Sequence, residues 1–275
     1  MRREGLGFVS WKGYNTFENM KKGGFMKDIF LNRKKSDRSG LLDSLRGITV
    51  ISMVLFHGMW DVYYLFDVNA EWFRGVPGFI WQQLTCCAFI FLSGFCGAMG
   101  RRTLRRGLMV FALGMGITAI TVFFTPEERI WFGVLTMIGS CMMLVGLAKS
   151  TLLKVPAKAG LCVSLFLFLL TRDVNEGYIG ILFWEWMELP AWFYQNYVTT
   201  YLGFPFEGFY SSDYFSLMPW LFLFLGGFYF YGICGKQVVS VKWQGFSALN
   251  FIGRHALLIY VLHQPIIYGL LSLWA

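Results

Sequence analysis

The chain has 275 residues, of which 56% are hydrophobic and only 15% are charged. Soluble domains carry about 45–50% apolar and about 25% charged residues. This composition excludes an ordinary soluble domain, a disordered chain and a disulfide-rich secreted protein. Apolar runs of about 17 residues or more recur along most of the sequence, which is typical of a polytopic membrane protein.

The N-terminal segment, residues 1–40, is polar and basic. It contains ten Lys and Arg residues and lacks an apolar core followed by a small-residue cleavage site, so a signal peptide is not predicted. We expect a poorly ordered cytoplasmic tail at 1–40 and a single membrane domain at 41–275. Met26 lies inside this segment as an alternative start.

Seven apolar spans are predicted after the tail. The shortest, 155–171, barely reaches the length that a transmembrane helix needs. The fold class is therefore an all-α membrane helical bundle with about seven transmembrane helices. The predicted spans are 42–66, 77–99, 104–124, 131–148, 155–171, 214–233 and 250–272.

Charge predicts how these spans are oriented. Basic connections at 101–106 and 149–158 alternate with acidic ones such as 127–128. Lys and Arg favour the cytoplasmic side, so we expect the N-terminus inside and the C-terminus outside. The net charge of +8 then serves orientation and contact with anionic lipid rather than nucleic acid.

A long outer loop is expected at 172–213, rich in aromatic and acidic residues. Loops of this length in compact domains are usually functional. Two interpretations stay open for Trp184, Trp186 and Trp192. They lie in an amphipathic helix of an aromatic belt at the membrane interface, or they belong to a lid that stacks on a sugar.

His57 and Asp61 are four residues apart in the first span, so they share one helix face. A carboxylate one turn from an imidazole fixes its tautomer and raises its basicity, as a general base requires. The alternative is a buried pair that joins two helices.

Asp43 and Arg46 begin the first span on its inner side. One interpretation makes Asp43 a helix cap and lets Arg46 reach the lipid headgroups. The other makes Arg46 a ligand for phosphate. Arg254 and His255, expected in the first turns of the last span, also suit an anion at a helix N-terminus.

His263 lies deeper in the last span, beside Gln264 and Pro265. It meets His57 if the first and last spans are adjacent, and otherwise forms a hydrogen bond between helices. Near the sixth span, Ser211 or Ser212 is expected to cap the helix at 214–233, with Asp213 near its positive end.

Other common site patterns are missing from the sequence. It contains no Gly-rich phosphate loop, no zinc-spaced Cys/His set and no Gly-x-Ser-x-Gly elbow, so no metal site is predicted. The six Cys residues are interpreted as small packing residues.

Four motifs follow one another along the chain: residues 42–47 with His57 and Asp61; 131–135; 202–205 with 211–215 and 219–220; and 253–255 through 263–265. Together they resemble the bacterial heparan-α-glucosaminide N-acetyltransferase-like family of integral membrane proteins, related to the wider membrane acyltransferase group. The sequence departs from the family pattern at Thr136, where a His commonly follows the second motif.

The resemblance implies transfer of an acetyl group from cytoplasmic acetyl-CoA to an amine or hydroxyl of a sugar-like acceptor of the cell envelope. It implies a prokaryotic plasma-membrane enzyme with His57 as general base. Asp61 and His263 complete its catalytic set, and the CoA contacts would be Asp43, Arg46, Arg254 and His255. Direct transfer and an acetyl-His intermediate both stay open.

Two other functions remain possible at this point. In a proton-coupled transporter, the same buried His and Asp side chains carry protons. A non-catalytic homologue is the third interpretation, favoured by Thr136. The acceptor and the oligomeric state are left open by the sequence.

Overall fold

The computed structural model describes residues 39–64, 68–100, 102–181, 184–241 and 245–273. Nearly all of the expected basic tail therefore lies outside the described residues. Within them the all-α prediction is confirmed, with one two-stranded sheet beside the helices. The main helices are α2 (Gly40–Tyr64), α4 (Val76–Met99), α5 (Thr103–Phe124), α6 (Val134–Leu152), α7 (Ala157–Leu170), α9 (Trp220–Ser240), α10 (Ser247–Arg254) and α11 (Ala256–Ser272).

The described helices include five to six of spanning length and hydropathy, against the seven spans predicted. Among the described helices, α2, α4, α5, α6 and α9 are long and apolar enough to cross a membrane. Helices α10 and α11 pass this test only as one pair, bent by 85°, which raises the number to six. The expected span at 155–171 is α7, whose 14 residues extend about 21 Å against a hydrocarbon core of about 30 Å.

Two other boundaries also move. The sixth predicted span, 214–233, is observed as α9 at Trp220–Ser240, because residues 211–219 form an irregular connection with turns. The last predicted span, 250–272, is broken at His255, which ends α10 and begins α11. Arg254 therefore closes a short helix and does not lie in the first turn of a long one.

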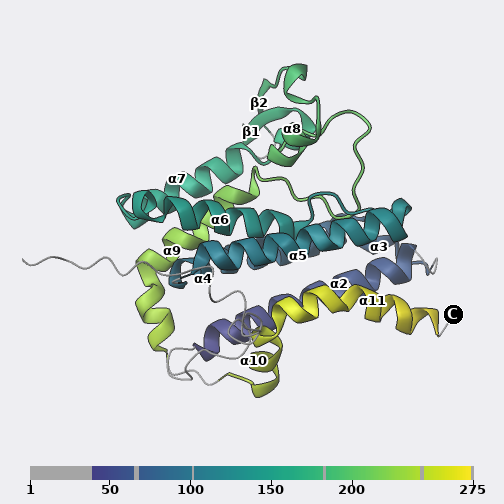
Figure 1. Cartoon of the computed structure of the whole chain (residues 1–275), viewed down its shortest axis with the longest axis horizontal. Helices are drawn as coiled ribbons and strands as arrows, with labels where there is room; N and C mark the ends of the chain where they lie inside the picture. The colour runs from purple at the N-terminus through teal and green to yellow at the C-terminus, as the bar shows by residue number, and fades with distance from the viewer. Residues whose placement is uncertain (1–38, 65–67, 101, 182–183, 242–244, 274–275) are drawn as a thin grey trace, which may run out of the picture. The chain divides into compact units, whose positions relative to one another are not determined.

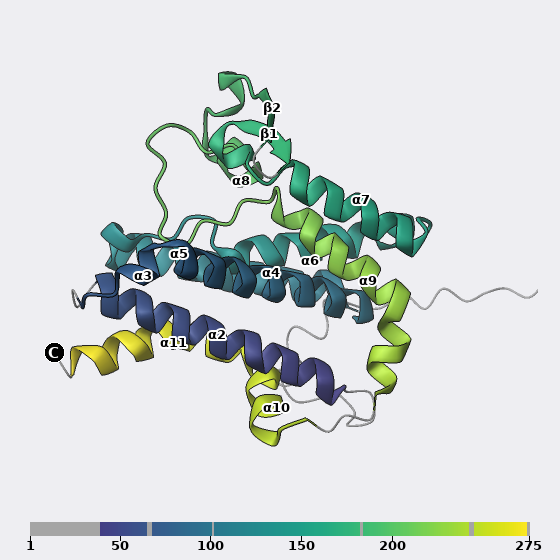
Figure 2. The same cartoon turned by 180° about the vertical axis from the view of Figure 1, so that it is seen from behind.

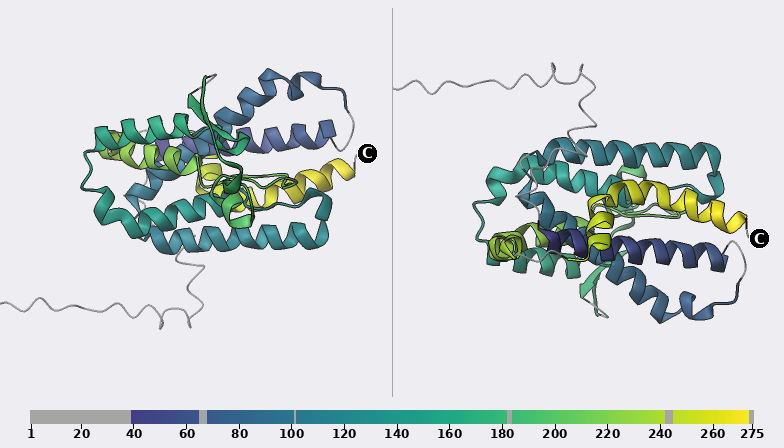
Figure 3. Two further views of the ribbon diagram at one scale, coloured as in Figure 1. Left: turned by 90° about the horizontal axis from the view of Figure 1, so that it is seen from above. Right: turned by 90° about the horizontal axis from the view of Figure 1, so that it is seen from below.

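The bundle is built from neighbouring helices, antiparallel in the pairs α5–α6 and α7–α9 and parallel in the pair α2–α11. Figure 1 shows α5 along α6 and α7 along α9, and Figure 2 shows α2 and α11 side by side. The view from below in Figure 3 also shows α11 beside α2. The core lies where α4, α6 and α9 meet, around the fully buried Ile90, Met137 and Phe224.

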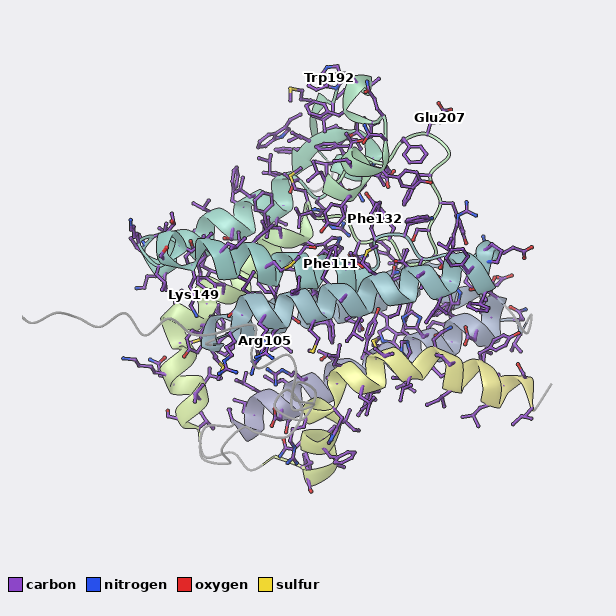
Figure 4. The ribbon with its side chains drawn as sticks, viewed as in Figure 1. Arg105, Phe111, Phe132, Lys149, Trp192 and Glu207 are labelled. Atoms are coloured by element: carbon purple, nitrogen blue, oxygen red, sulfur yellow. The ribbon has the colours of Figure 1, made fainter. Side chains whose placement is uncertain are left out.

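The basic and acidic connections lie at opposite ends of the bundle. The α4–α5 and α6–α7 turns lie at one end, and Lys149 and Arg105 lie toward it (Figures 1 and 4). Helix α3 (Glu71–Arg74) and the α5–α6 turn lie at the other end, where α11 finishes. This arrangement agrees with the alternation of charge in the sequence, whereas the sidedness in the membrane stays a prediction.

Residues 172–213 form a small lobe and not a featureless loop. Strand β1 (Tyr178–Ile181) pairs antiparallel with β2 (Trp184–Glu188), and α8 (Tyr197–Leu202) follows. The expectation of an amphipathic helix at Trp184 and Trp186 is therefore wrong, since both lie exposed on a strand. Figure 4 shows Trp192 at the tip of the lobe.

Two glycines let α10 lie directly on α2. A Cβ atom added to Gly47 would be 2.3 Å from the carbonyl oxygen of Leu249, and one added to Gly253 would be 1.8 Å from that of Asp43. Ser44 also donates a hydrogen bond of 2.8 Å to Asn250. The motifs at 42–47 and 253–255 are thus in backbone contact.

We expect Gly253→Ala to destabilise the bundle, because the new methyl group would push α10 away from α2. Overpacking of this kind costs about 1–3 kcal/mol. Thermal unfolding in detergent measures the loss. Gly116→Ala is the matched control, since an added Cβ meets nothing within 4 Å there. An equal loss of stability in both variants would contradict the packing argument.

Candidate functional site

The candidate site begins with two imidazoles that face each other across α2 and α11. The ring centroids of His57 and His263 are 4.9 Å apart. The adjacency of the first and last predicted spans is therefore confirmed. His263 is buried, at 8% exposure, and His57 is half-buried.

The tautomer of His263 follows from its hydrogen bond. Its Nδ1 lies 2.6 Å from the carbonyl oxygen of Tyr260. A carbonyl oxygen only accepts, so Nδ1 must carry the proton. In the neutral ring Nε2 then holds the lone pair, and this buried atom has no hydrogen-bond partner among the described residues. A free, oriented lone pair is what a general base presents.

Asp61 pairs with α11 and not with His57. Its side chain is fully buried, and Oδ1 accepts a 2.8 Å hydrogen bond from Nε2 of Gln264. The other oxygen, Oδ2, has no partner within the described part of the chain. The expectation that Asp61 orients His57 is not met in this geometry, although both residues lie on α2 one turn apart.

Asp213, the last residue of the lobe, also belongs to the site. Its Oδ2 accepts from the backbone N–H of Val134 at 3.3 Å and lies 3.5 Å from the hydroxyl of Tyr260. Burial raises the pKa of Asp213 above the usual carboxyl range. Asp213 therefore links the start of α6 to the residue that orients His263.

This geometry corrects the predicted capping of the sixth span. Ser211 Oγ accepts from the backbone N–H of Trp131 and donates to its carbonyl, both at 2.9 Å. Ser212 Oγ donates to the carbonyl oxygen of Glu128 at 3.0 Å. Together with Asp213 they hold residues 128–134, and α9 begins at Pro219 without a side-chain cap.

The segment held by these hydrogen bonds also contains an unusual backbone conformation, at Phe132. Its φ is +55°, in the left-handed region that non-glycine residues rarely adopt. The carbonyl of Phe132 accepts a 2.9 Å hydrogen bond from the N–H of Phe215, and its ring packs on Tyr201. Figure 4 shows Phe132 between the bundle and the lobe. Strained residues of this kind cluster at functional sites.

A cavity of about 210 Å³ lies between helices of the same bundle, and none of His57, Asp61 and His263 lines it. Arg46 and Arg106 contribute its cationic side chains, and most of the remaining lining is apolar. Arg46 also forms an ion pair of 3.2 Å with Asp43, so Asp43 positions the guanidinium. Five helices line the cavity: α2, α4, α5, α6 and α11.

Aromatic ring contacts run from a residue that lines the cavity to the histidines. Phe89 lines the cavity and stacks on Tyr260, with 6.1 Å between ring centroids. The rings of Tyr260 and His263 are 5.5 Å apart. A chain of two aromatic contacts therefore connects a cationic cavity with an imidazole pair.

Arg254 and His255 lie beside this cavity and do not line it. Arg254 is exposed and donates to the carbonyl of Asn250 at 2.8 Å. His255 donates through Nδ1 to the carbonyl of Phe251 at 2.8 Å. The next two residues of α11, Ala256 and Leu257, do line the cavity. The sequence did not single out Arg106 as a site residue, because the basic residues at 101–106 were interpreted only as evidence for orientation in the membrane.

Thr136 is a helix-packing residue. It is buried at 1% exposure, and a Cβ added to Gly114 on α5 would be 2.5 Å from its Oγ1. At the position where the resemblance led us to expect His, this chain therefore carries a side chain that contacts α5 closely.

The family model described as heparan-alpha-glucosaminide N-acetyltransferase, catalytic, matches residues 38–265, which include every element of the site. The chain belongs to this family. It is an integral membrane protein of a membrane acetyltransferase family. No curated protein and no solved structure matches the chain.

Asp213→Ala should destabilise the protein by about 1 kcal/mol, because the first turn of α6 loses its acceptor. Asp213→Asn keeps a side-chain oxygen and should lose less. Glu207→Ala, in the exposed loop labelled in Figure 4, is the control. Thermal unfolding in detergent ranks the three variants, and equal midpoints for Asp213→Ala and Glu207→Ala would refute the capping role.

Proposed function

We propose that this protein transfers an acetyl group from acetyl-CoA to an amine or hydroxyl of a sugar-like acceptor. The observation that carries the proposal is the connection between the cationic cavity and the His57–His263 pair. Membership of the family supports the reaction class. The acceptor is assigned to the cell envelope because the aromatic lobe and the acidic connections are expected on the outer side of a prokaryotic plasma membrane.

The donor would enter from the cytoplasmic side. Guanidinium groups bind phosphate strongly and in a planar geometry, so Arg46 and Arg106 suit the anionic part of CoA. Ligand pockets for whole drug-sized molecules measure about 300–1,000 Å³. A cavity of about 210 Å³ is therefore assigned to the thioester arm, with the nucleotide outside it near Arg254 and His255.

The imidazole pair would supply the base. One imidazole takes the proton from the acceptor, while the amine nitrogen or hydroxyl oxygen of the acceptor attacks the thioester carbon. The carbon–sulfur bond breaks, and the CoA thiolate takes up the proton from the imidazolium. His57 is the base favoured by the sequence, and the free Nε2 lone pair adds His263 as the atom best prepared for this step. Direct transfer needs no nucleophile from the protein.

Arg46→Ala and Arg106→Ala should each weaken acetyl-CoA binding about tenfold, as loss of one charge-assisted contact to phosphate predicts. Isothermal titration of purified protein in detergent measures the dissociation constant. Lys236→Ala, at the end of α9 and absent from the cavity lining, is the matched charge control. No saturable binding to folded wild type would refute the donor assignment.

His263→Ala and His57→Ala should retain acetyl-CoA binding and lose transfer by a factor of about 10² or more, because a general base contributes about 10²–10⁴-fold. Transfer of labelled acetyl from acetyl-CoA to a panel of amino sugars and sugars measures the rate. Lys236→Ala, near the end of α9 and absent from the cavity lining, is again the control. Full transfer by His263→Ala and His57→Ala would remove the imidazole pair from the mechanism.

Proton-coupled transport is the second candidate, favoured by the buried Asp61 beside two imidazoles. It requires no acyl-CoA. Proton uptake into proteoliposomes without acetyl-CoA, lost in His57→Ala, would favour transport over acetylation.

A further inference from the structure

Two oxygens at the α2–α11 contact lack a donor. They are Asp61 Oδ2 and Gln264 Oε1, and both are buried without a partner among the described residues. The same two side chains are already joined by a 2.8 Å hydrogen bond from Gln264 Nε2 to Asp61 Oδ1. Buried polar atoms are nearly always paired, so two orphan acceptors on two bonded groups call for an explanation.

An ionised carboxylate does not explain this arrangement. A carboxylate only accepts, and the oxygen of the Gln264 amide also only accepts, so neither can satisfy the other. No ion pair joins Asp61 to a described Lys, Arg or His; the ion pair of α2 is the one between Arg46 and Asp43. The titratable neighbours are His57, one turn earlier on α2, and His263, whose Nδ1 proton is committed to Tyr260. An unpaired charge at zero exposure is strongly unfavourable.

We propose that Asp61 carries a proton in the resting protein and forms a two-way acid–amide pair with Gln264. Gln264 Nε2 donates to Asp61 Oδ1, and the Oδ2–H of Asp61 donates to Gln264 Oε1. One proton on one atom thus satisfies both orphan oxygens. The pair is neutral, so it needs no buried counter-ion.

This pair has a positioning role in the site. Gln264 follows His263 directly, and Pro265 comes next inside α11, where it removes a backbone donor from the helix. The acid–amide pair therefore fixes α11 to α2 at the turn where His263 meets His57. Asp61 and Gln264 are positioning residues, and the free Nε2 of His263 is left as the unpaired acceptor of the cluster.

The inference deepens the proposed function, because it assigns the carboxyl a neutral role beside the imidazole pair. It predicts that Asp61→Asn preserves the contact, since an amide in place of the acid also donates one hydrogen bond and accepts another. Asp61→Leu removes both bonds. We expect Asp61→Leu to lower transfer about tenfold or more through misplacement of His263, and Asp61→Asn to restore most of that loss.

Infrared spectroscopy tests the proton without any donor or acceptor. A protonated carboxyl has a carbonyl stretch separate from that of a carboxylate, and this band shifts in deuterated water. At neutral pH the wild type should show the band, and Asp61→Asn should lose intensity that Asp213→Asn, the other buried carboxyl of the site, retains. Gln264→Met should shift the band, because the acid loses its amide partner.

The outcomes separate this inference from the proposed function. A spectrum of folded Asp61→Asn identical to that of wild type overturns the inference, whatever the transfer assay shows. Transfer lost as completely in folded Asp61→Asn as in His263→Ala also overturns it, because a carboxylate would then be required. A band lost in Asp61→Asn from a wild type that binds no acetyl-CoA supports the acid–amide pair and refutes the acetyltransferase instead.

Discussion

The structure depends on how polar groups are paired where water does not reach. In an apolar bundle every buried donor and acceptor must find its partner inside the protein. At the α2–α11 contact the partners come from the two ends of the described chain: Asp61 bonds to a residue 203 positions away. This pairing places the first and last helices together, and with them His57 and His263. The site is therefore a consequence of the requirement that stabilises the bundle.

The same requirement explains the connection at 211–216. Residues 128–134 turn sharply before α6, and their backbone groups need partners away from a regular helix. Ser211, Ser212 and Asp213 supply these partners, and the chain accepts a left-handed Phe132 in return. Asp213 then also contacts Tyr260, so the pairing that closes α6 reaches the helix that carries His263.

Much of the bundle was predictable because hydropathy alone predicts long helices. The positions of α2, α4 and α5 agree with the expected spans within a few residues. The adjacency of His57 and His263 was also predictable as a hypothesis, since both lie deep in apolar helices. The expected span at 155–171 is shorter in the structure, because α7 begins only after Pro156 and ends at Leu170. The break at His255 directly follows the polar Arg254, and the predicted span had included both residues in its first turns.

The partners of the site residues could not be predicted for a different reason. Spacing along one helix suggested that Asp61 serves His57, but spacing describes only which groups share a face. A carboxyl one turn from an imidazole can still turn toward another helix, and here a hydrogen bond to Gln264 holds it there. Arg106 shows the same limit, since its charge was explained by topology and yet its side chain lines the cavity. Gly47 and Gly253 were named only as parts of motifs, yet they lie where the backbones of α2 and α10 touch and no side chain fits. The glycines explain why these two segments are in contact, whereas the chemistry of the site follows from the buried atoms that the α2–α11 contact leaves unpaired.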